Sequence, residues 1–262
     1  MSDSPRAIAI IPARLGSTRF PGKVLASETG RPLVQHVVEG ASAAPSVQRV
    51  VVACDDEQIA AALAPFGTEC VLTRTDHPNG TSRLLEAAQS LGLPDDALVV
   101  NVQGDEPEIE PGIIDAAVES VRRGERWAHP PAVGTVASPF AGDERPDNPA
   151  IVKAVVGETD AGGVGRALYF SRALVPHHRE GGEPVAPLKH VGIYAYRVAS
   201  LRLYAGLSPT PLERCEQLEQ LRWLEHGHAI AVAVRRAAHH GVDTPEQYAE
   251  FVRRYRGERA GG

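Results

Sequence analysis

The feature that most constrains the fold is a regular alternation, through the first half of the chain, of short apolar runs with helix-like stretches. The apolar runs cover 7–11, 49–54 and 97–102, and the helix-like stretches cover 32–44, 56–64, 81–91 and 111–123. Runs of five or six apolar residues without strict alternation are typical of strands covered on both faces. Strand and helix in this order predict right-handed crossovers and a mostly parallel sheet, and therefore an α/β fold.

The second half of the chain has a different character. Further strands are expected at 134–138, 151–156, 191–196 and 229–234, and helices at 209–226 and 245–255. Between Phe140 and Pro187 the chain is rich in Gly and Pro. Such a stretch predicts hairpins and loops, with antiparallel strands at an edge of the sheet.

Composition narrows the class of protein. The 262 residues include 33 acids and 27 Lys plus Arg, a formal net charge of −6, so a nucleic-acid partner recognised through bulk positive charge is excluded. No apolar run has the length of a membrane span, and no signal-peptide pattern opens the chain, so membrane insertion is not expected. Three scattered cysteines argue against a disulfide framework and a structural zinc site. We expect a cytoplasmic protein.

The segment PARLGSTRFPGK, residues 12–23, follows the first strand directly and carries the strongest functional signal. Its cations Arg14, Arg19 and Lys23, with two glycines for close backbone approach, predict a cradle for a triphosphate. The spacing differs from a P-loop, because five residues separate the glycines and Val24 follows the lysine; no GxGxxG is present. The alternative is a solvated basic loop that binds nothing.

Two acidic segments are candidates for Mg²⁺. Asp105, with Glu106 beside it, follows the strand at 97–102, where a carboxylate could hold the ion against phosphate oxygens. Helix capping is the alternative for Asp105. Asp243 in GVDTPE offers a second carboxylate, but taken alone it fits a helix N-cap better, and one residue could do both.

Histidines and one further arginine give weaker signals. In TRTDHPNGTSR, residues 73–83, Arg74 and His77 could reach a base or a phosphate, and a solvated loop explains them nearly as well. The adjacent pairs His177-His178 and His239-His240 point in different directions and are expected in surface loops.

These segments together resemble a known family. In chain order they are IIPARLGSTRFPGK, TRTDHPNGTSR, VNVQGDEP, ALYFSRALVP, KHVGIYAY, LEQLRWLEHG and GVDTPE. The ordered set, from about residue 7 to 255, is similar to the CMP-Kdo synthetases, the 3-deoxy-D-manno-octulosonate (Kdo) cytidylyltransferases. The resemblance implies a Mg²⁺-dependent transfer of CMP from CTP to Kdo with release of pyrophosphate, which supplies CMP-Kdo for lipopolysaccharide. It also implies a Rossmann-like nucleotide-diphospho-sugar transferase fold with a smaller antiparallel lobe, used as a cytosolic homodimer.

The resemblance assigns roles position by position. It implies a catalytic set of Arg14, Lys23, Asp105 and Asp243, with the two aspartates as Mg²⁺ ligands. The nucleotide would contact Pro12, Ala13, Arg14, Lys23, Arg74, Ser82 and Gln103. The sugar would contact Arg172, His190, Tyr194, Glu219 and Gln220. Ser82 stands where the family commonly has an acid, which alters a loop near the nucleotide.

The resemblance also implies an organisation for the chain. A single domain, 1–262, would comprise a nucleotide-binding core at about 1–138 and 198–262 and an inserted lobe for sugar binding and dimerisation at about 139–197. Two other functions stay open. One is a cytidylyltransferase for a different sugar acid, such as 8-amino-Kdo or sialic acid; the other is a catalytically inert nucleotide-binding module.

Overall fold

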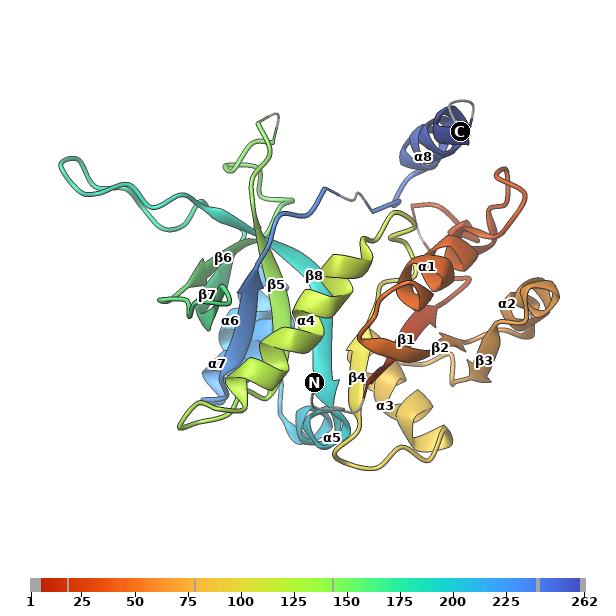
Figure 1. Cartoon of the computed structure of the whole chain (residues 1–262), viewed down its shortest axis with the longest axis horizontal. Helices are drawn as coiled ribbons and strands as arrows, with labels where there is room; N and C mark the ends of the chain where they lie inside the picture. The colour runs from red at the N-terminus through yellow and green to blue at the C-terminus, as the bar shows by residue number, and fades with distance from the viewer. Residues whose placement is uncertain (1–5, 18, 78, 143, 239–240, 260–262) are drawn as a thin grey trace. The chain divides into compact units, whose positions relative to one another are not determined.

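The computed structural model of the chain describes residues 6–17, 19–77, 79–142, 144–238 and 241–259 (Figure 1). The pair His239-His240 therefore lies outside the described residues. The chain divides into two compact units, one formed by 1–114 with 239–262 and the other by 115–238. Helix α4 (Pro111–Gly124) begins in the first unit and continues into the second.

The first unit is built on parallel strands in the order β3-β2-β1-β4. Its elements are β1 (Ala7–Ala13), η1 (Lys23–Leu25), α1 (Leu33–Ser42), β2 (Val47–Cys54), α2 (Glu57–Leu63), η2 (Ala64–Phe66), β3 (Glu69–Leu72), α3 (Gly80–Ser90), β4 (Leu98–Asn101) and α8 (Pro245–Arg259). The β1 residues Ile8 to Ile10 pair in parallel register with Val99 to Asn101 of β4. This is the strand order of half a Rossmann fold, in which the crevice at the carboxyl ends of β1 and β4 is the expected ligand site.

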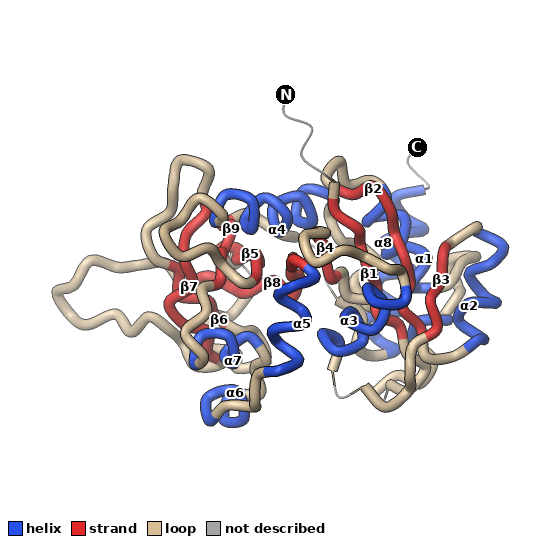
Figure 2. The backbone as a smooth tube through the Cα atoms, turned by 90° about the horizontal axis from the view of Figure 1, so that it is seen from below, coloured by secondary structure: helices blue, strands red, loops and turns tan. Residues whose placement is uncertain are grey.

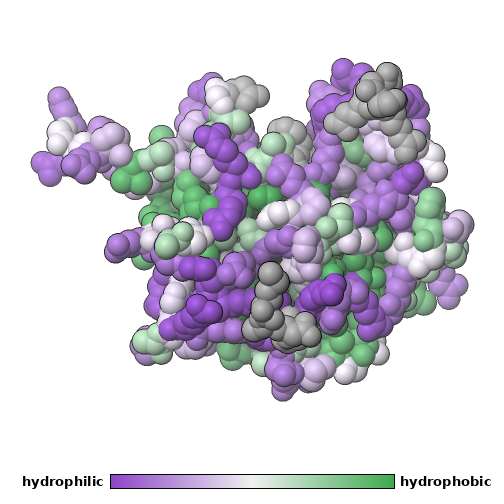
Figure 3. Space-filling view, in the orientation of Figure 1, coloured by the Kyte–Doolittle hydropathy of each residue, from purple (hydrophilic) through white to green (hydrophobic). Residues whose placement is uncertain are grey.

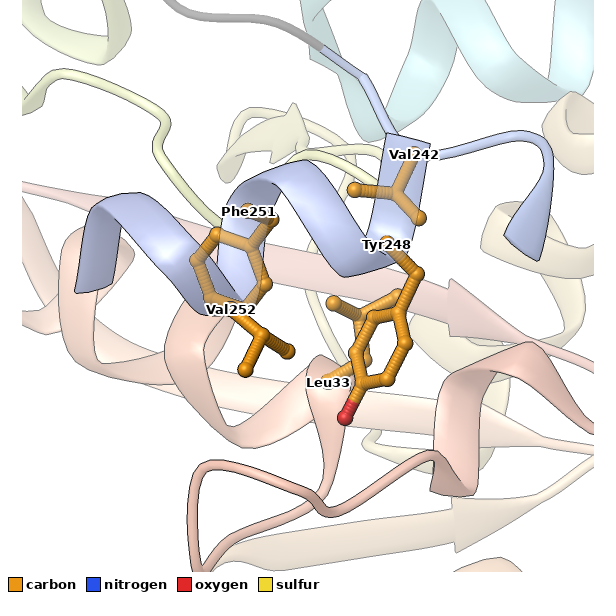
Figure 4. Packing of buried hydrophobic residues seen from close by; sticks show 5 residues of the cluster. All are labelled: Leu33, Val242, Tyr248, Phe251 and Val252. Atoms are coloured by element: carbon orange, nitrogen blue, oxygen red, sulfur yellow. The ribbon is translucent and has the colours of Figure 1, made fainter. Parts of the chain in front are cut away.

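Helices cover these strands and bury the apolar residues of β1, β2 and β4. Helix α1 packs on β1 and β2, α2 packs on β2 and β3, and α3 packs on β1, β2 and β3, an arrangement visible in Figure 2. The C-terminal helix α8 joins the same unit through a small core of its own. Its side chains Tyr248, Phe251 and Val252 pack with Val242 against Leu33, the first residue of α1 (Figure 4).

In the second unit the strands form a ring. Its elements are β5 (Val133–Pro139), β6 (Lys153–Val156), β7 (Val164–Ser171), β8 (Leu188–Arg197), α5 (Val198–Gly206), α6 (Pro211–Glu216), α7 (Gln220–Glu225) and β9 (Ile230–Val234). The order is β8-β5-β9-β7-β6, and β6 also pairs with β8, so the ring closes. Only β5 and β9 are parallel among these described pairs.

The α/β class is confirmed, but the detail of a mostly parallel sheet is not. Parallel pairing holds throughout the first unit, whereas antiparallel pairing dominates the second. Strands β3 and β7 and helix α5 were not predicted, because β3 is a short run of half-polar residues and β7 lies in the Gly-rich region.

The prediction of one helix over 209–226 is wrong. The segment forms two short helices, α6 and α7, separated at Gln217, whose φ of 54° is left-handed and cannot continue a helix. The break places Glu219 and Gln220 at the start of a new helix, rather than in the middle of a long amphipathic one.

The loop between β7 and β8 is largely polar at its surface. It projects at the far left of Figure 1 and is mainly hydrophilic in Figure 3, although Leu174 and Val185 in it are exposed. His177-His178 are exposed there, as predicted. Within the described parts of the chain, every helix is too short or too polar to pass through a lipid bilayer.

Candidate active site

The loop that follows β1 is held by a residue that directly follows β2. The backbone N–H of Leu15 donates to Asp55, which follows β2, at 3.3 Å. Gly22 closes the loop in a left-handed conformation, with a φ of 68°, and its N–H donates to Leu15 O at 3.1 Å. Arg14 is exposed, and no described side chain forms an ion pair with it. The loop therefore keeps an uncompensated cation directly after the strand.

Lys23, on the other side of this loop, joins three segments that are far apart in sequence. Its buried ammonium donates to Asp105 Oδ2 at 2.6 Å, to Asp243 Oδ1 at 3.0 Å and to Val242 O at 3.0 Å. Because Asp105 Oδ2 and Asp243 Oδ1 both accept from the same nitrogen, the distance between these two oxygens cannot exceed the sum of the two hydrogen-bond lengths. The predicted catalytic residues Lys23, Asp105 and Asp243 are thus brought together.

Asp105 owes its position to the backbone around it. A Cβ on Gly104 would lie 2.7 Å from Pro12 O, so only glycine allows the turn after β4 to press against the end of β1. On the other side Val242 N donates to Asp105 O at 2.7 Å. The Asp105 backbone is therefore fixed between β1 and the segment before α8.

Asp243 does not cap α8. Thr244 does so: Gln247 N donates to Thr244 Oγ1 at 3.3 Å, and Thr244 N donates to Gln247 Oε1 at 3.1 Å, which makes a reciprocal capping box. Asp105 likewise caps no helix, because α4 begins at Pro111. Both capping alternatives are therefore wrong. Each carboxylate instead faces the side chain of a cationic residue.

The donor set around Lys23 fits a divalent cation. Lys23 and Arg19, the latter 2.9 Å from Asp243 Oδ2, balance the two carboxylates. Both aspartate side chains are partly exposed, so each can accept a further ligand. Among the described residues no group of three or more His, Cys, Asp or Glu side chains could hold a metal. Mg²⁺, which takes one or two carboxylates and completes its shell with phosphate and water, suits such a pair.

The remaining nucleotide-side candidates lie on the segment between β3 and α3 and after β4. Ser82 N, in the first turn of α3, donates to Asn79 Oδ1 at 2.9 Å, and the Ser82 hydroxyl lies 3.0 Å from His77 Nδ1. Glu86 contacts His77 Nε2 and accepts from Arg74 N at 3.2 Å. Glu86, one helical turn after Ser82, is therefore the carboxylate that contacts this segment.

Gln103 is half-buried in the turn after β4, and Ala13 is buried at the end of β1. Both lie at the carboxyl edge of the sheet, where the strand order reverses. Sequence reasoning missed two supporting residues, Asp55 and Arg83. The Arg83 guanidinium donates to Thr73 at 2.6 Å and to Asp55 at 3.4 Å, so it steadies the carboxylate that holds the loop. The available signal was an acid directly after a buried strand.

The sugar-side candidates all belong to the second unit. His190, on β8, has its ring 5.0 Å from Phe170 and 5.4 Å from Tyr194, centroid to centroid. Its Nε2 lies 2.9 Å from the hydroxyl of Thr135 on β5. Burial lowers the pKa of His190 to about 4, so the imidazole is neutral at pH 7. Burial, with Glu219 as a second cause, raises the pKa of Tyr194.

Arg172 is partly exposed, and its guanidinium donates to backbone carbonyls. Its guanidinium donates to Glu216 O at 2.7 Å, Pro149 O at 3.3 Å and Gln217 O at 3.4 Å, so it holds the break between α6 and α7. Glu219 follows this break and is exposed, whereas Gln220 is buried. Sequence reasoning also missed Lys153, whose wholly buried ammonium donates to the carbonyl of Arg172.

Comparisons with known proteins identify the family. The profile of the cytidylyltransferase family matches residues 8–230. A 3-deoxy-manno-octulosonate cytidylyltransferase of Syntrophobacter fumaroxidans is 47% identical over 94% of this chain and 96% of its own. That of Nitratidesulfovibrio vulgaris is 44% identical over 94% of both chains, and that of Herminiimonas arsenicoxydans is 46% identical over 94% of this chain and 97% of its own.

Solved structures give the same result. A CMP-2-keto-3-deoxy-manno-octonic acid synthetase complexed with CTP has a TM-score of 0.85 and 37% identity, over 97% of this chain and 99% of that one. A cytidylyltransferase from Leptospira borgpetersenii, 15% identical over 95% of this chain and 85% of that one with a TM-score of 0.57, shares the fold. The chain belongs to the cytidylyltransferase family, in the group of the 3-deoxy-manno-octulosonate cytidylyltransferases.

Proposed function

We propose that the protein transfers CMP from CTP to the anomeric hydroxyl of Kdo, with release of pyrophosphate. The observation that carries this proposal is the convergence of Lys23, Asp105 and Asp243 at the carboxyl ends of β1 and β4, where the loop after β1 also carries the exposed Arg14. Cations and a carboxylate pair at such a strand edge suit a nucleoside triphosphate. The names of the relatives and the CTP complex of the similar structure support the choice of CTP and Kdo.

The chemistry needs no nucleophilic side chain. The nucleophile is the anomeric hydroxyl of the sugar, which attacks the α-phosphorus in line and expels pyrophosphate. Such transfers are catalysed mainly by positioning and by neutralising charge. Arg14 and Lys23 would hold the triphosphate, and Gln103 and the Arg74 segment would lie near the base. Pro12 and Ala13 would place the nucleotide through their backbone.

We propose that Asp105 and Asp243 hold Mg²⁺. Bound there, the ion would offset charge on the phosphates and make the attacking hydroxyl more acidic. The protein's own part is to keep the two carboxylates at the same place, which it does through Gly104, the Val242–Asp105 hydrogen bond and Lys23.

On the sugar side we propose contacts from His190, Tyr194, Glu219 and Gln220, with Arg172 fixing the turn that presents the last two. A neutral imidazole and a phenol suit the hydroxyl groups of a sugar, because they exchange hydrogen bonds without requiring a counterion. Glu219 at the head of α7 would accept from a sugar hydroxyl.

We also propose a homodimer that works in the cytoplasm and supplies CMP-Kdo for lipopolysaccharide. The three cysteines, Cys54, Cys70 and Cys215, are all free thiols, which supports a reducing compartment. Sedimentation or light scattering would measure the number of subunits.

The test is pyrophosphate release from CTP, Kdo and Mg²⁺, with UTP, ATP, sialic acid, 8-amino-Kdo and EDTA in parallel reactions. We expect release that requires CTP, Kdo and the metal together. Release with another sugar acid but not with Kdo would overturn the substrate and keep the reaction. CTP binding without release from any sugar would overturn the activity and leave a nucleotide-binding module. Activity that survives EDTA would overturn the metal assignment.

A further inference from the structure

A wholly buried hydroxyl on β5 determines which ring nitrogen of His190 carries the proton. Thr135 is 0% exposed, and its Oγ1 lies 2.7 Å from Ile193 O, 2.9 Å from His190 Nε2 and 3.4 Å from Val191 O. Neither the sequence patterns nor the proposed function uses this side chain. Any effect of Thr135 on the substrate depends on the proposed role of His190 in binding the sugar.

The hydroxyl of Thr135 donates its hydrogen bond to a backbone carbonyl. Two oxygens only 2.7 Å apart require a proton between them, because otherwise their lone pairs would repel. The Thr135 hydroxyl has one proton to donate. Because a carbonyl can only accept, this proton points at Ile193 O. Thr135 Oγ1 must then accept from His190, so Nε2 carries the imidazole proton.

The need for this hydroxyl comes from the strand pairing itself. The register of β5 against β8 shifts between Thr135, which faces Tyr194, and Val136, which faces Val191. Gly192 and Ile193 therefore lie within this irregular stretch of β8. An irregularity of this kind leaves backbone groups for side chains to satisfy and changes the direction of neighbouring side chains. Thr135 satisfies the Ile193 carbonyl and, through the same atom, holds His190.

The other ring nitrogen is left with a lone pair. No hydrogen bond from a described residue reaches Nδ1 of His190, and the aromatic rings of Phe170 and Tyr194 pack against the imidazole. His190 keeps part of its surface exposed. An acceptor in apolar surroundings selects a ligand that brings a proton, since an unmatched polar group there is unfavourable.

We propose that Thr135 is a positioning residue, which holds His190 as the Nε2–H tautomer so that Nδ1 accepts a hydrogen bond from a hydroxyl group of the sugar substrate. The group recognised at this point is a hydroxyl donor and not the sugar's carboxylate. The tautomer is present before any substrate binds, because Thr135 and Ile193 impose it.

The first test reads the tautomer in the free protein. Long-range ¹H–¹⁵N spectra distinguish Nδ1 from Nε2 protonation, and the signal of His190 is assigned among ten histidines by its loss in His190→Asn. We expect an Nε2–H imidazole in the wild type and in Thr135→Ser, and a changed nitrogen pattern in Thr135→Val. A wild-type His190 protonated at Nδ1 would overturn the proposal without recourse to any variant.

The second test is kinetic. We expect Thr135→Val to raise KM for Kdo about tenfold, the effect of one weakened hydrogen bond, with KM for CTP and kcat changed less than about threefold. Thr135→Ser should stay near the wild type. His190→Gln, whose amide can still donate toward Thr135 but offers no acceptor in place of Nδ1, should match or exceed the loss in Thr135→Val.

A double-mutant comparison separates positioning from simple packing. His190→Asn offers an oxygen near the place of Nδ1 but has no atom to reach Thr135. If Thr135 acts through His190, adding Thr135→Val to His190→Asn should change KM for Kdo less than about twofold. A full tenfold effect in that background would overturn the proposal and mark Thr135 as a packing residue. If the wild type releases no pyrophosphate with Kdo, the proposed function fails, while the spectra still decide the tautomer.

Discussion

The head of α8 offers the sharpest separation of a catalytic carboxylate from a structural cap. Asp243 and Thr244 are adjacent, and the sequence alone suits either residue as the N-cap. In the structure Thr244 caps the helix, while Asp243 faces Lys23 and Arg19. Thr244→Ala and Asp243→Asn should therefore have opposite profiles, one lowering stability and the other activity.

The magnitudes follow from the contacts. Thr244→Ala removes the acceptor for Gln247 N, and losing such a cap costs about 1 kcal/mol of the free energy of unfolding, or a fall in Tm of about 2–4 °C. Asp243 is 41% exposed in its side chain, and an ion pair this open contributes about 0–1 kcal/mol. Its backbone N–H remains bonded to Gln247 Oε1 in the variant. Asp243→Asn should therefore change Tm by less than Thr244→Ala does.

Activity should show the reverse order. Loss of a carboxylate from the pair that we propose for Mg²⁺ should lower kcat about 100-fold or more, whereas Thr244→Ala should stay within about threefold of the wild type. Pyrophosphate release and thermal unfolding, measured on the same preparations, give both quantities. Near-normal turnover in Asp243→Asn, with a Tm loss as large as that of Thr244→Ala, would refute the assignment and restore Asp243 to a capping role.

Three further predictions concern the loop, the turn and the sugar side. Lys23→Met keeps the aliphatic stem but leaves the two carboxylates without their shared ammonium, so pyrophosphate release should fall about 100-fold or more. Gly104→Ala places a Cβ 2.7 Å from Pro12 O and should lower the free energy of unfolding by about 1–3 kcal/mol in urea titrations, whereas Gly112→Ala, whose Cβ meets open space, should not. The pKa of His190 is lowered to about 4 from 6.5, so between these pH values the unfolded chain binds a proton that the folded protein does not. Stability should therefore fall as the pH drops from about 6.5 toward 4, by at most about 3 kcal/mol, and urea titrations of His190→Gln should lack this component.

The first unit was predictable because its signals are local and repeated. Every expected strand of the first half is present, since apolar runs such as 97–102 must be buried whatever surrounds them. The second unit was harder to predict. Strand β7 lies among Gly and Pro residues, and its place in the ring depends on pairing with β6 and β9, which no local pattern encodes.

The break at Gln217 shows how periodicity misleads. Apolar residues recur every three positions from Leu212 to Leu224, with Cys215 among them, and satisfy a helical pattern, yet the chain turns at Gln217. The turn is held by the Arg172 guanidinium, which donates to the carbonyls of Glu216 and Gln217 at the break. Because Arg172 is remote in sequence, only the folded chain reveals that these carbonyls have partners outside a helix.

Paired charges make up the candidate set around Lys23, whereas a neutral imidazole is among the sugar-side candidates, and this difference explains which site residues the sequence could reveal. In the first unit charges are kept and paired: Lys23 holds two carboxylates, and Asp55 is held by Arg83. Charged residues in Gly-rich loops after strands are conspicuous, so most of this set could be predicted. In the second unit burial keeps the imidazole of His190 neutral. The property that matters there is the position of one proton, and that position is decided by a threonine hydroxyl and a backbone carbonyl, which carry no sequence signal. A cluster of charges at strand ends can therefore be predicted from composition and spacing, whereas the protonation of a neutral side chain depends on hydrogen-bond geometry that only the fold supplies.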